Sequence, residues 1–494
     1  MRWAWLALLV ASSAAAQTAS TIGITRGNFL RKPEYATQSA LNLYVETTGN
    51  DANFCTDVTT PCLTIQGAVD KIPKLVRHPV TITTGLGTFS AGAVISGFTF
   101  DKAATGTDRY IWVRGALIDA TPTTGPTTGT ATSGTAGTAD TLTWGTLTLT
   151  AAGWTVNDLR GKLIEITGGT GSGQIRPVSS NTADTITVPG TWTAPSATST
   201  FAIRGWGTLI SGVVSAPGTP SNPASAASAF YITDMAKAVT GSVVVDKFKF
   251  THTTGRTLVV NSEISTVFQY CDFHSTSAAN LINAFGAPSV ALQYNYGLVP
   301  AGARLVQTQS TSMGSLYLDR NVVDALTTGV VAEVSSANAT FYFNDFKNTS
   351  SALIRLMGST SNISIATNKL DCNSAGGIGV DSLTASSSAY PLKPATRGNG
   401  NIRFTTNDIS NCATAINLKG DIHAYFEAGV VSGTGNTTAV SVADQASADI
   451  EADTTLTGAT ELLIEGTAYT LANLRALSPK RIADLSTGAM VFEP

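Results

Sequence analysis

The most regular feature of the chain is a short phrase in which apolar residues alternate with others and an asparagine follows. In ISIATNKLDC, residues 363 to 372, two isoleucines alternate with other residues, and Asn368 comes before the next apolar position. IRFTTNDISNC repeats the arrangement 39 residues later, with Asn407 in the same place. Alternation with a period of two is typical of a β-strand with one buried face.

The phrase recurs along the second half of the chain. Successive copies are 22 to 26 residues apart, except for the single spacing of 39. That exception is a normal repeat plus an insert, which we place in the Ser-, Pro- and Gly-rich stretch 384–400. The positions equivalent to asparagine are Phe248, Cys271, Asn295, Asn321, Asn344, Asn368, Asn407, Gly429 and Asp453.

A repeat of this length predicts a solenoid, because one such unit cannot bury its apolar face alone but a stack of units can. Each copy becomes one coil, paired to the next by parallel strand hydrogen bonds about 4.8 Å apart. The asparagines are expected at a sharp bend, in the left-handed backbone region, with their side chains bonded up the column. A second alternation after each bend, such as Leu305-Val306 and Val330-Val331, predicts a second sheet. The alternative is a β-sandwich with evenly spaced strands.

At this point the chain resembles the right-handed parallel β-helix proteins of the pectin-lyase-like superfamily. The resemblance extends to the stretch LYVETTGNDANFCTDVTTPCLTIQGAVDKIP, residues 43 to 73. Its Tyr-Val strand, Gly-x-Asp and Pro-x-x-Thr-Ile turn are similar to the opening of secreted β-helix proteins. The resemblance implies a short helix from Gln66 to Ile72 that caps the open end of the first coil.

Composition shifts divide the chain further. Residues 1–16 have the pattern of a signal peptide, and 17–120 are expected to hold the N-terminal cap and first coils. Residues 121–205 read as a Thr/Gly/Pro-rich linker to residue 140, followed by an inserted β module. Within it, GGTGSGQIRPVSSNTADTITV is similar to a segment of phage tail and bacterial β-helix proteins. Regular coils are expected over 206–461 and a C-terminal cap with a helical turn at Leu471 to Leu477 over 462–494.

The charge content and the cysteines bear on which partners the protein binds and in which compartment it works. Charged residues make up 13% of the 494 residues and the net charge is −3, which argues against a nucleic-acid surface. After the first residues, no stretch of 18 apolar residues predicts a membrane span. We expect an exported protein, secreted or at the cell surface, with a disulfide between Cys55 and Cys62. Cys372 and Cys412 could pair if their coils stack, the alternative being two buried thiols, and Cys271 would remain unpaired.

Known β-helix enzymes mostly act on acidic polysaccharides through side chains on an outer face, so we looked for charges in one outward column. Asp319, Arg320, Asp345 and Lys369 fall on neighbouring coils and form the candidate catalytic set, with the cations binding a uronate carboxylate. The alternative is a solvated face with scattered charge. A candidate sugar-binding strip of aromatic rings lies nearby: Tyr270, Tyr294, Tyr317 and Tyr342.

Two function classes follow. One is a protein that binds polysaccharide or cell-surface glycan and processes it as a lyase or hydrolase. The other is a non-catalytic surface or fibre-type protein for adhesion or structure. The Gly-His-Gly motif of polygalacturonase-like hydrolases is missing from the sequence, and no zinc-ligand spacing occurs. The sequence therefore indicates no metal, except that a lyase of this kind would be expected to use calcium.

Overall fold

The structure is a computed structural model of the chain. It describes residues 36–101, 109–139, 142–215, 227–233, 235–237, 241–285, 289–308, 314–335, 338–347, 350–357, 362–383, 400–419, 422–427, 433–443, 446–450, 454–464, 467–469, 482–484 and 489–492. The expected signal peptide, the insert at 384–399 and the helical turn at Leu471 to Leu477 lie outside these residues. No helix in this part of the chain is long and apolar enough to cross a membrane.

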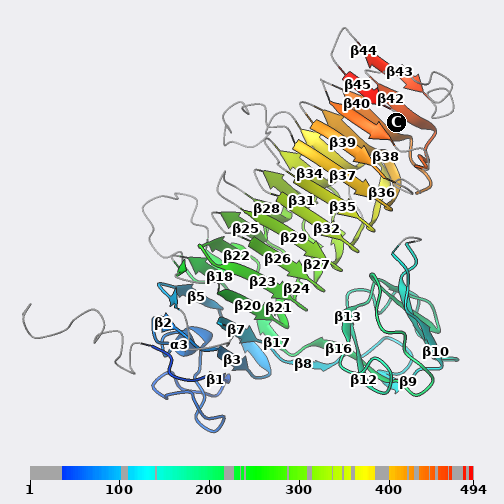
Figure 1. The fold of residues 1–494 in the computed structure, drawn as a ribbon. Helices are drawn as coiled ribbons and strands as arrows, with labels where there is room; N and C mark the ends of the chain where they lie inside the picture. Colours follow the sequence, from blue (N-terminus) through cyan, green and yellow to red (C-terminus); the bar gives the residue numbers. More distant parts are fainter. Residues whose placement is uncertain are drawn as a thin grey trace, which may run out of the picture.

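Sheet 1 runs along the whole column of coils (Figure 1). All of its pairings are parallel except the last, between β44 and β45. Its strands, in spatial order, are β1 (Leu41–Val45), β3 (Val80–Thr84), β7 (Tyr110–Arg114), β20 (Ser242–Asp246), β23 (Ser265–Gln269), β26 (Ser289–Gln293), β29 (Ser315–Asp319), β32 (Asn338–Tyr342), β35 (Asn362–Ala366), β37 (Gly400–Thr405), β39 (Ile422–Phe426), β41 (Ser447–Ile450), β45 (Ala489–Phe492) and β44 (Ile482–Asp484).

Sheet 2 is formed by the strands that follow each bend. Its pairings are parallel except that of β42 with β43. Its strands are β4 (Gly87–Phe89), β5 (Ala93–Ser96), β17 (Thr208–Ile210), β18 (Ser228–Thr233), β21 (Phe248–Phe250), β22 (Arg256–Asn261), β24 (Asp272–Phe273), β25 (Ile282–Phe285), β27 (Tyr296–Val299), β28 (Arg304–Thr308), β30 (Val322–Ala325), β31 (Val330–Ser335), β33 (Asp345–Lys347), β34 (Ala352–Met357), β36 (Lys369–Leu383), β38 (Asp408–Lys419), β40 (Thr438–Ala443), β42 (Thr460–Ile464) and β43 (Thr467–Tyr469).

These two sheets confirm the predicted parallel β-helix. The inward residues of both sheets form one hydrophobic core that runs from Leu43 to Ile464. Rings stack along it from coil to coil, as in Phe250 on Phe273 with ring centroids 5.4 Å apart. The register places Ile363 beside Ile402 across the long insert, so the coil continues in step on either side of it.

The predicted asparagine column is also present. Asn344 Nδ2 donates to Asn368 Oδ1 at 2.9 Å and to the carbonyl of Leu318 at 2.9 Å, while its own Oδ1 accepts from Asn321 Nδ2 at 3.0 Å. All of these groups are buried. The column extends from Asn295 to Asn407. Gly429 and Asp453, which were aligned with it, lie outside the described residues.

The backbone conformation of this column differs from the expectation by one residue. The left-handed residue is the one before each asparagine: φ is 58° at Tyr294, 53° at Arg320 and 55° at Phe343. The side chain of Asn344 bonds main-chain groups of the preceding coil, at Leu318 and Asn321, and the side chain of Asn368 on the next coil.

Both expected disulfides are present, between Cys55 and Cys62 and between Cys372 and Cys412. The second joins residues 40 apart in sequence on adjacent coils, on either side of the long insert. Cys271 is a buried free thiol. Two disulfides in one chain fit an extracellular protein.

The inserted β module is confirmed as a separate antiparallel unit, drawn in teal beside the coils (Figure 1). It has its own core, centred on buried residues such as Trp154, Ile164 and Phe201. The stretch expected as a linker contributes two of its strands, because alternating threonines suit a pleated edge. The strands are β8 (Leu117–Asp119), β9 (Thr128–Thr130), β10 (Ser133–Thr135), β11 (Gly145–Thr148), β12 (Leu163–Gly168), β13 (Ile175–Pro177), β14 (Ser180–Asn181), β15 (Thr185–Val188) and β16 (Thr200–Trp206).

At the N-terminal end, α3 (Ile65–Val69) overlaps the stretch expected to be helical, but it begins one residue before Gln66 and ends three residues before Ile72. Thr64 caps it by accepting from the N–H of Gly67, and Asp51 in turn binds Thr64. Its role as a cap on the first coil stays a prediction. A small sheet of β2 (Leu75–Val76), β6 (Thr99–Phe100) and β19 (Ala236–Lys237) completes the early coils.

Candidate functional site

The inserted module leaves the coils and returns to them at the bend between sheets 1 and 2. β7 precedes it in sheet 1, and β17 resumes sheet 2 by pairing with β4 below and β21 above. The module then contacts the same bend on later coils. Trp206 Nε1 donates to the carbonyl of Tyr270 at 2.6 Å, and the Arg176 guanidinium lies 4.7 Å from the ring centroid of Tyr294. These are the coils on which the sequence placed its candidate site.

Asp345 lies beneath the module. Its Oδ2 accepts from Arg160 Nη1 at 2.5 Å and from Ser179 Oγ at 2.6 Å, and the residue is 1% exposed. Burial alone would raise the pKa of this carboxyl, but the Arg160 and Lys347 charges and the two hydrogen bonds hold that pKa below its usual range. Arg160 also binds Asp324 at 2.9 Å. Asp345 therefore anchors the module, and a polymer outside the protein has no access to it.

Lys369 is engaged in the same way. Its ammonium lies 4.2 Å from the ring centroid of Trp144 in the module. The register places Lys369 directly beside Asp345, so the two are neighbours as expected. Asp345 and Lys369 both contact the module, so neither side chain is part of an open surface.

Asp319 and Arg320 belong to a different group. Arg320 Nη1 binds Asp319 Oδ2 at 2.7 Å, and its guanidinium lies within 5.9 Å of the ring centroids of Tyr294 and Tyr342. Tyr317, two residues before Asp319 on β29, faces the same side, since residues two apart on a strand share a face. We call these residues, with Arg176 from the module, the Asp319 cluster: Arg176, Tyr294, Tyr317, Asp319, Arg320 and Tyr342.

The electrostatics of the Asp319 cluster are set mainly by burial. Burial raises the pKa of Asp319, against the opposing charges of Arg320 and Arg176. Asp319 Oδ1 is buried and has no hydrogen-bond partner among the described residues. The pKa of Tyr317 is raised by burial and by the Asp319 charge. Tyr294, Tyr317 and Tyr342 are each partly exposed to solvent.

Tyr270 continues the aromatic group downward. Its ring stacks on that of Tyr294 with centroids 5.2 Å apart and planes 11° from parallel. Burial raises the pKa of Tyr270 to about 12. The sequence thus predicted four tyrosines that the fold does gather, but it did not predict Arg176, which reaches them from a module with no repeat to align.

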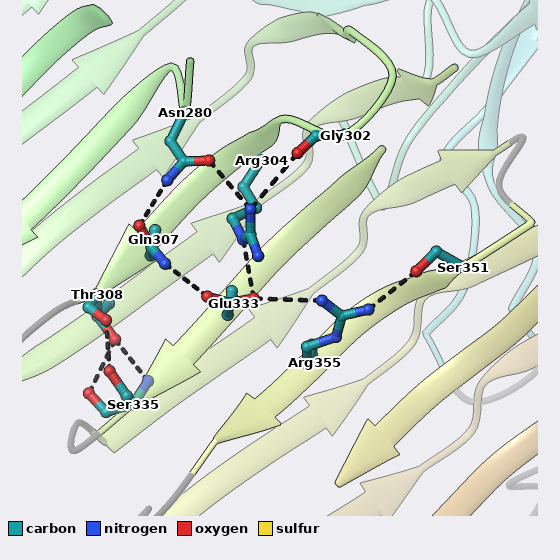
Figure 2. A network of polar contacts seen from close by, with 9 residues as sticks. All are labelled: Asn280, Gly302, Arg304, Gln307, Thr308, Glu333, Ser335, Ser351 and Arg355. Atoms are coloured by element: carbon teal, nitrogen blue, oxygen red, sulfur yellow. Dashed lines mark hydrogen bonds and ion pairs between the residues drawn. The ribbon is translucent and has the colours of Figure 1, made fainter. Parts of the chain in front are cut away.

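A second polar group lies on sheet 2, and Figure 2 shows it across β28, β31 and β34. Glu333, 4% exposed, accepts from Arg304 Nε at 2.8 Å, from Gln307 Nε2 at 2.5 Å and from Arg355 Nη1 at 3.4 Å. Because three donors already engage this carboxylate, we assign the group to holding the coils in register. It belongs to one outward column: Asn283, Gln307, Glu333, Arg355, Asp381 and Asn417.

The sequence contains a pattern for this column that is separate from the asparagine repeat and was not used to predict it. Each member directly follows an apolar residue of the second alternation, as Asp381 follows Val380. A polar residue that recurs at that point in successive coils indicates an outward ladder. Asp381 receives a 2.8 Å hydrogen bond from Asn417, and burial raises the pKa of its carboxyl.

Asp246 is a further buried carboxylate on the outer side of sheet 1. It is 1% exposed, and its Oδ2 accepts from Trp112 Nε1 at 3.2 Å and lies 3.6 Å from Arg114 Nε. Its other oxygen has no hydrogen-bond partner in the part of the chain that the structure describes. Burial raises the pKa of Asp246 to about 6, although Lys247 and Arg114 oppose the shift.

The raised pKa of Asp246 predicts a pH-dependent stability. The folded protein holds this proton more tightly than the unfolded chain, so the favourable contribution is complete below about pH 4 and is lost as the pH rises through about 6. Relative to Asp246→Asn, the wild-type free energy of unfolding should fall by roughly 1–3 kcal/mol between pH 4 and pH 7. Urea unfolding at a series of pH values measures this difference. The exposed Asp70→Asn is the control, and an equal pH slope in wild type and Asp246→Asn would contradict the prediction.

No group of three or more His, Cys, Asp or Glu that could hold a metal ion occurs within the described ranges. Around Asp319 the neighbours are guanidinium groups and tyrosines, which are not calcium ligands. The residues present at this site therefore do not fit a calcium-dependent lyase, and no step is derived through the ion.

Comparison with known proteins found no matching family model and no matching curated protein. Among solved structures, a glycoside hydrolase matches at 10% identity over 88% of this chain and 98% of that chain, with a TM-score of 0.32. The gp54 tailspike of Acinetobacter baumannii bacteriophage AP22, in complex with capsular saccharide, matches at 13% identity over 78% and 74%, with a TM-score of 0.21. The gp49 tailspike of Pseudomonas phage LKA1 matches at 12% identity over 80% and 69%, with a TM-score of 0.19. The fold assignment itself rests on the strand pairings described above.

Proposed function

We propose that this protein binds polysaccharide at the Asp319 cluster, on the outer face of sheet 1 beside the inserted module. The observation that carries the proposal is the gathering of three partly exposed tyrosines beside Arg320, whose guanidinium lies over the rings of Tyr294 and Tyr342. Pyranose rings present flat faces of C–H groups, and tyrosine rings stack against such faces while their hydroxyls bond sugar oxygens. Contacts with Arg320 and Arg176 hold the rings in place before a ligand arrives.

The charge of the cluster favours an acidic polysaccharide. Arg320 and Arg176 both lie over Tyr294, and Asp319 is the carboxylate paired with them. A guanidinium binds a uronate carboxylate through two parallel hydrogen bonds. Burial raises the pKa of Asp319, so this carboxylate takes up its proton at a higher pH than a free aspartate, which leaves the two guanidinium groups to set the charge of the site.

Binding is favoured over processing at this site. Asp345, the second carboxylate proposed for catalysis, is sealed by Arg160 and Ser179. Most glycosidases cleave the glycosidic bond with two carboxyl groups that flank it. The second candidate function is a lyase or hydrolase that uses Asp319 alone as the ionisable group, and the raised pKa of Asp319 is what favours it.

The setting of this function is proposed to be extracellular. The two disulfides persist in oxidising compartments. The first 16 residues have the composition of a signal peptide, and export would bring the outer face into contact with cell-surface glycans.

Removal of the Tyr317 ring tests the proposal. Tyr317→Ala is expected to weaken binding to polygalacturonate or another acidic polysaccharide by at least about tenfold, since the ring supplies a sugar-stacking face. Affinity electrophoresis with a panel of acidic and neutral polysaccharides measures the effect. New reducing ends and absorbance from unsaturated sugars are followed in the same samples, and their appearance would favour the enzyme.

Tyr425→Ala is the matched control. Tyr425 is an outward tyrosine of sheet 1, 40% exposed, on a coil far from the module. It should retain wild-type affinity. Equal binding by wild type and Tyr317→Ala, or a wild type that binds no polysaccharide in the panel, would overturn the proposed function.

A further inference from the structure

A serine, a histidine and an aspartate form a hydrogen-bonded row on the outer face of sheet 1, away from the Asp319 cluster. Ser447 Oγ lies 2.6 Å from His423 Nδ1, and His423 Nε2 lies 3.2 Å from Asp449 Oδ2. None of these residues is buried: the side chains of His423 and Asp449 are 28% and 37% exposed. The geometry is that of a nucleophile, its base and a group that orients the base.

The register of the coils brings the three together. Ser447 and Asp449 are two residues apart on β41, so both point outward. In the parallel pairing, Ser447 is beside His423 and Asp449 is beside Tyr425. The histidine on β39 can thus reach both outward residues of β41. Inward residues between them, Ala448 and Ala424, belong to the core and fix both strands.

The surroundings support access by a substrate. The ring of Tyr425 meets His423 edge to face with centroids 4.4 Å apart, which restricts rotation of the imidazole. Arg403 is beside Tyr425 in the register, and its side chain is 64% exposed. Glu427 binds Arg403 Nε at 3.0 Å and so fixes the guanidinium on this face.

We propose that Ser447, His423 and Asp449 are an ester-hydrolysing site, whose substrate class is an acyl ester such as an O-acyl group on a glycan. The site goes beyond the proposed polysaccharide binding and does not depend on it. With the imidazole proton on Nε2, His423 donates to Asp449 and its Nδ1 accepts from the Ser447 hydroxyl. Ser447 and His423 are the catalytic residues, and Asp449 is a positioning residue.

The chemistry balances with water as the only co-reactant. Ser447 Oγ forms a bond to the acyl carbon while its proton passes to His423 Nδ1. The bond from that carbon to the alcohol oxygen then breaks, and the alcohol leaves with the proton from His423. Water attacks the acyl-serine with His423 again as base, which releases a carboxylic acid and restores the serine.

The test uses p-nitrophenyl acetate turnover and labelling by diisopropyl fluorophosphate on the full chain. Wild type should hydrolyse the ester and take one diisopropylphosphoryl group with loss of fluoride, located on Ser447 by peptide mapping. Ser447→Ala should take none, and His423→Ala should lower the rate by at least about a hundredfold. Asp449→Asn should lower the rate and also shift the acid limb of the pH–rate profile, which a purely structural role would not do.

His274→Ala is the matched control: His274 Nδ1 lies 3.8 Å from Asp272 Oδ1, and within the described ranges this nitrogen has no hydrogen bond to a serine. It should keep wild-type activity and labelling. Thermal unfolding shows whether each variant is folded. A folded wild type that neither hydrolyses the ester nor takes the label would overturn the proposal, as would labelling of Ser447→Ala to the wild-type extent.

Discussion

Arg160→Met is expected to destabilise the protein by about 3–5 kcal/mol, the largest single-residue effect that the structure predicts. The Arg160 side chain, 12% exposed, binds Asp345 and Asp324, and Asp345 is 1% exposed. Without the guanidinium, Asp345 must either keep an unpaired buried charge or take up a proton. Chemical denaturation at neutral pH measures the change in the free energy of unfolding, and fluorescence of Trp144 and Trp206 reports release of the module.

Arg204→Met is the matched control for this change. Arg204 is an arginine of the same module that pairs with Asp119 and Glu165, but these partners are 57% and 27% exposed. Ion pairs open to solvent contribute at most about 1 kcal/mol. Adding Asp345→Asn to Arg160→Met should recover part of the loss. A loss no larger than that of Arg204→Met would show that Arg160 does not anchor the module.

The ion pair between Arg160 and Asp345 also makes the stability of the folded protein depend on pH in acid solution. The pKa of Asp345 is depressed in the folded state, so its contribution to stability is present above the usual range of an aspartate and is lost as the pH falls through and below it. The contribution of Asp246 to stability changes in the opposite direction and at higher pH, because it is lost as the pH rises through about 6. Their combined effect gives stability that is greatest in mildly acidic solution.

Asn344→Ala is expected to cost about 2–4 kcal/mol, because it leaves several buried groups without partners. The carbonyl of Leu318 loses its side-chain donor, and the main-chain N–H and side-chain amide of Asn321 lose their acceptor. Each of these groups lies in the interior, where water cannot replace the lost hydrogen bond. Urea unfolding of the purified variant measures the effect.

Asn362→Ala is the control, since Asn362 is an exposed asparagine on a neighbouring coil of sheet 1. Its replacement should change the free energy of unfolding by less than about 0.5 kcal/mol. If the two variants unfold alike, the column would be a consequence of coil geometry and not a source of stability.

The repeat made the fold predictable because the coils stack, so that residues one repeat apart in sequence lie next to each other on adjacent coils. Asn344 and Asn368 are 24 residues apart and bond directly, and even the spacing of 39 preserves the column at Asn407. The pairing of Cys372 with Cys412 follows from the same geometry. The left-handed position was wrong by one residue, because alternation locates a bend but does not say which residue turns.

The candidate site was predictable only within the coils. The register brings Asp345 beside Lys369, as expected, and the tyrosines do gather around Arg320. The cover over Asp345 could not be predicted, because it comes from Ser179 and Arg160, which are 166 and 185 residues away in sequence. No periodicity links the module to the coils that it contacts, so the repeat carries no information about which outward residues it buries.

The bond between Arg160 and Asp345 also orders the events of assembly. Arg160 is synthesised long before its partner, and closing a loop of 185 residues is entropically costly until intervening structure shortens the path. Each coil added above β17 shortens that path by bringing the next bend alongside the module. The ion pair therefore forms only after the coils up to β33 have folded. Attachment of the module to Asp345 requires that the middle coils of the solenoid are already in place.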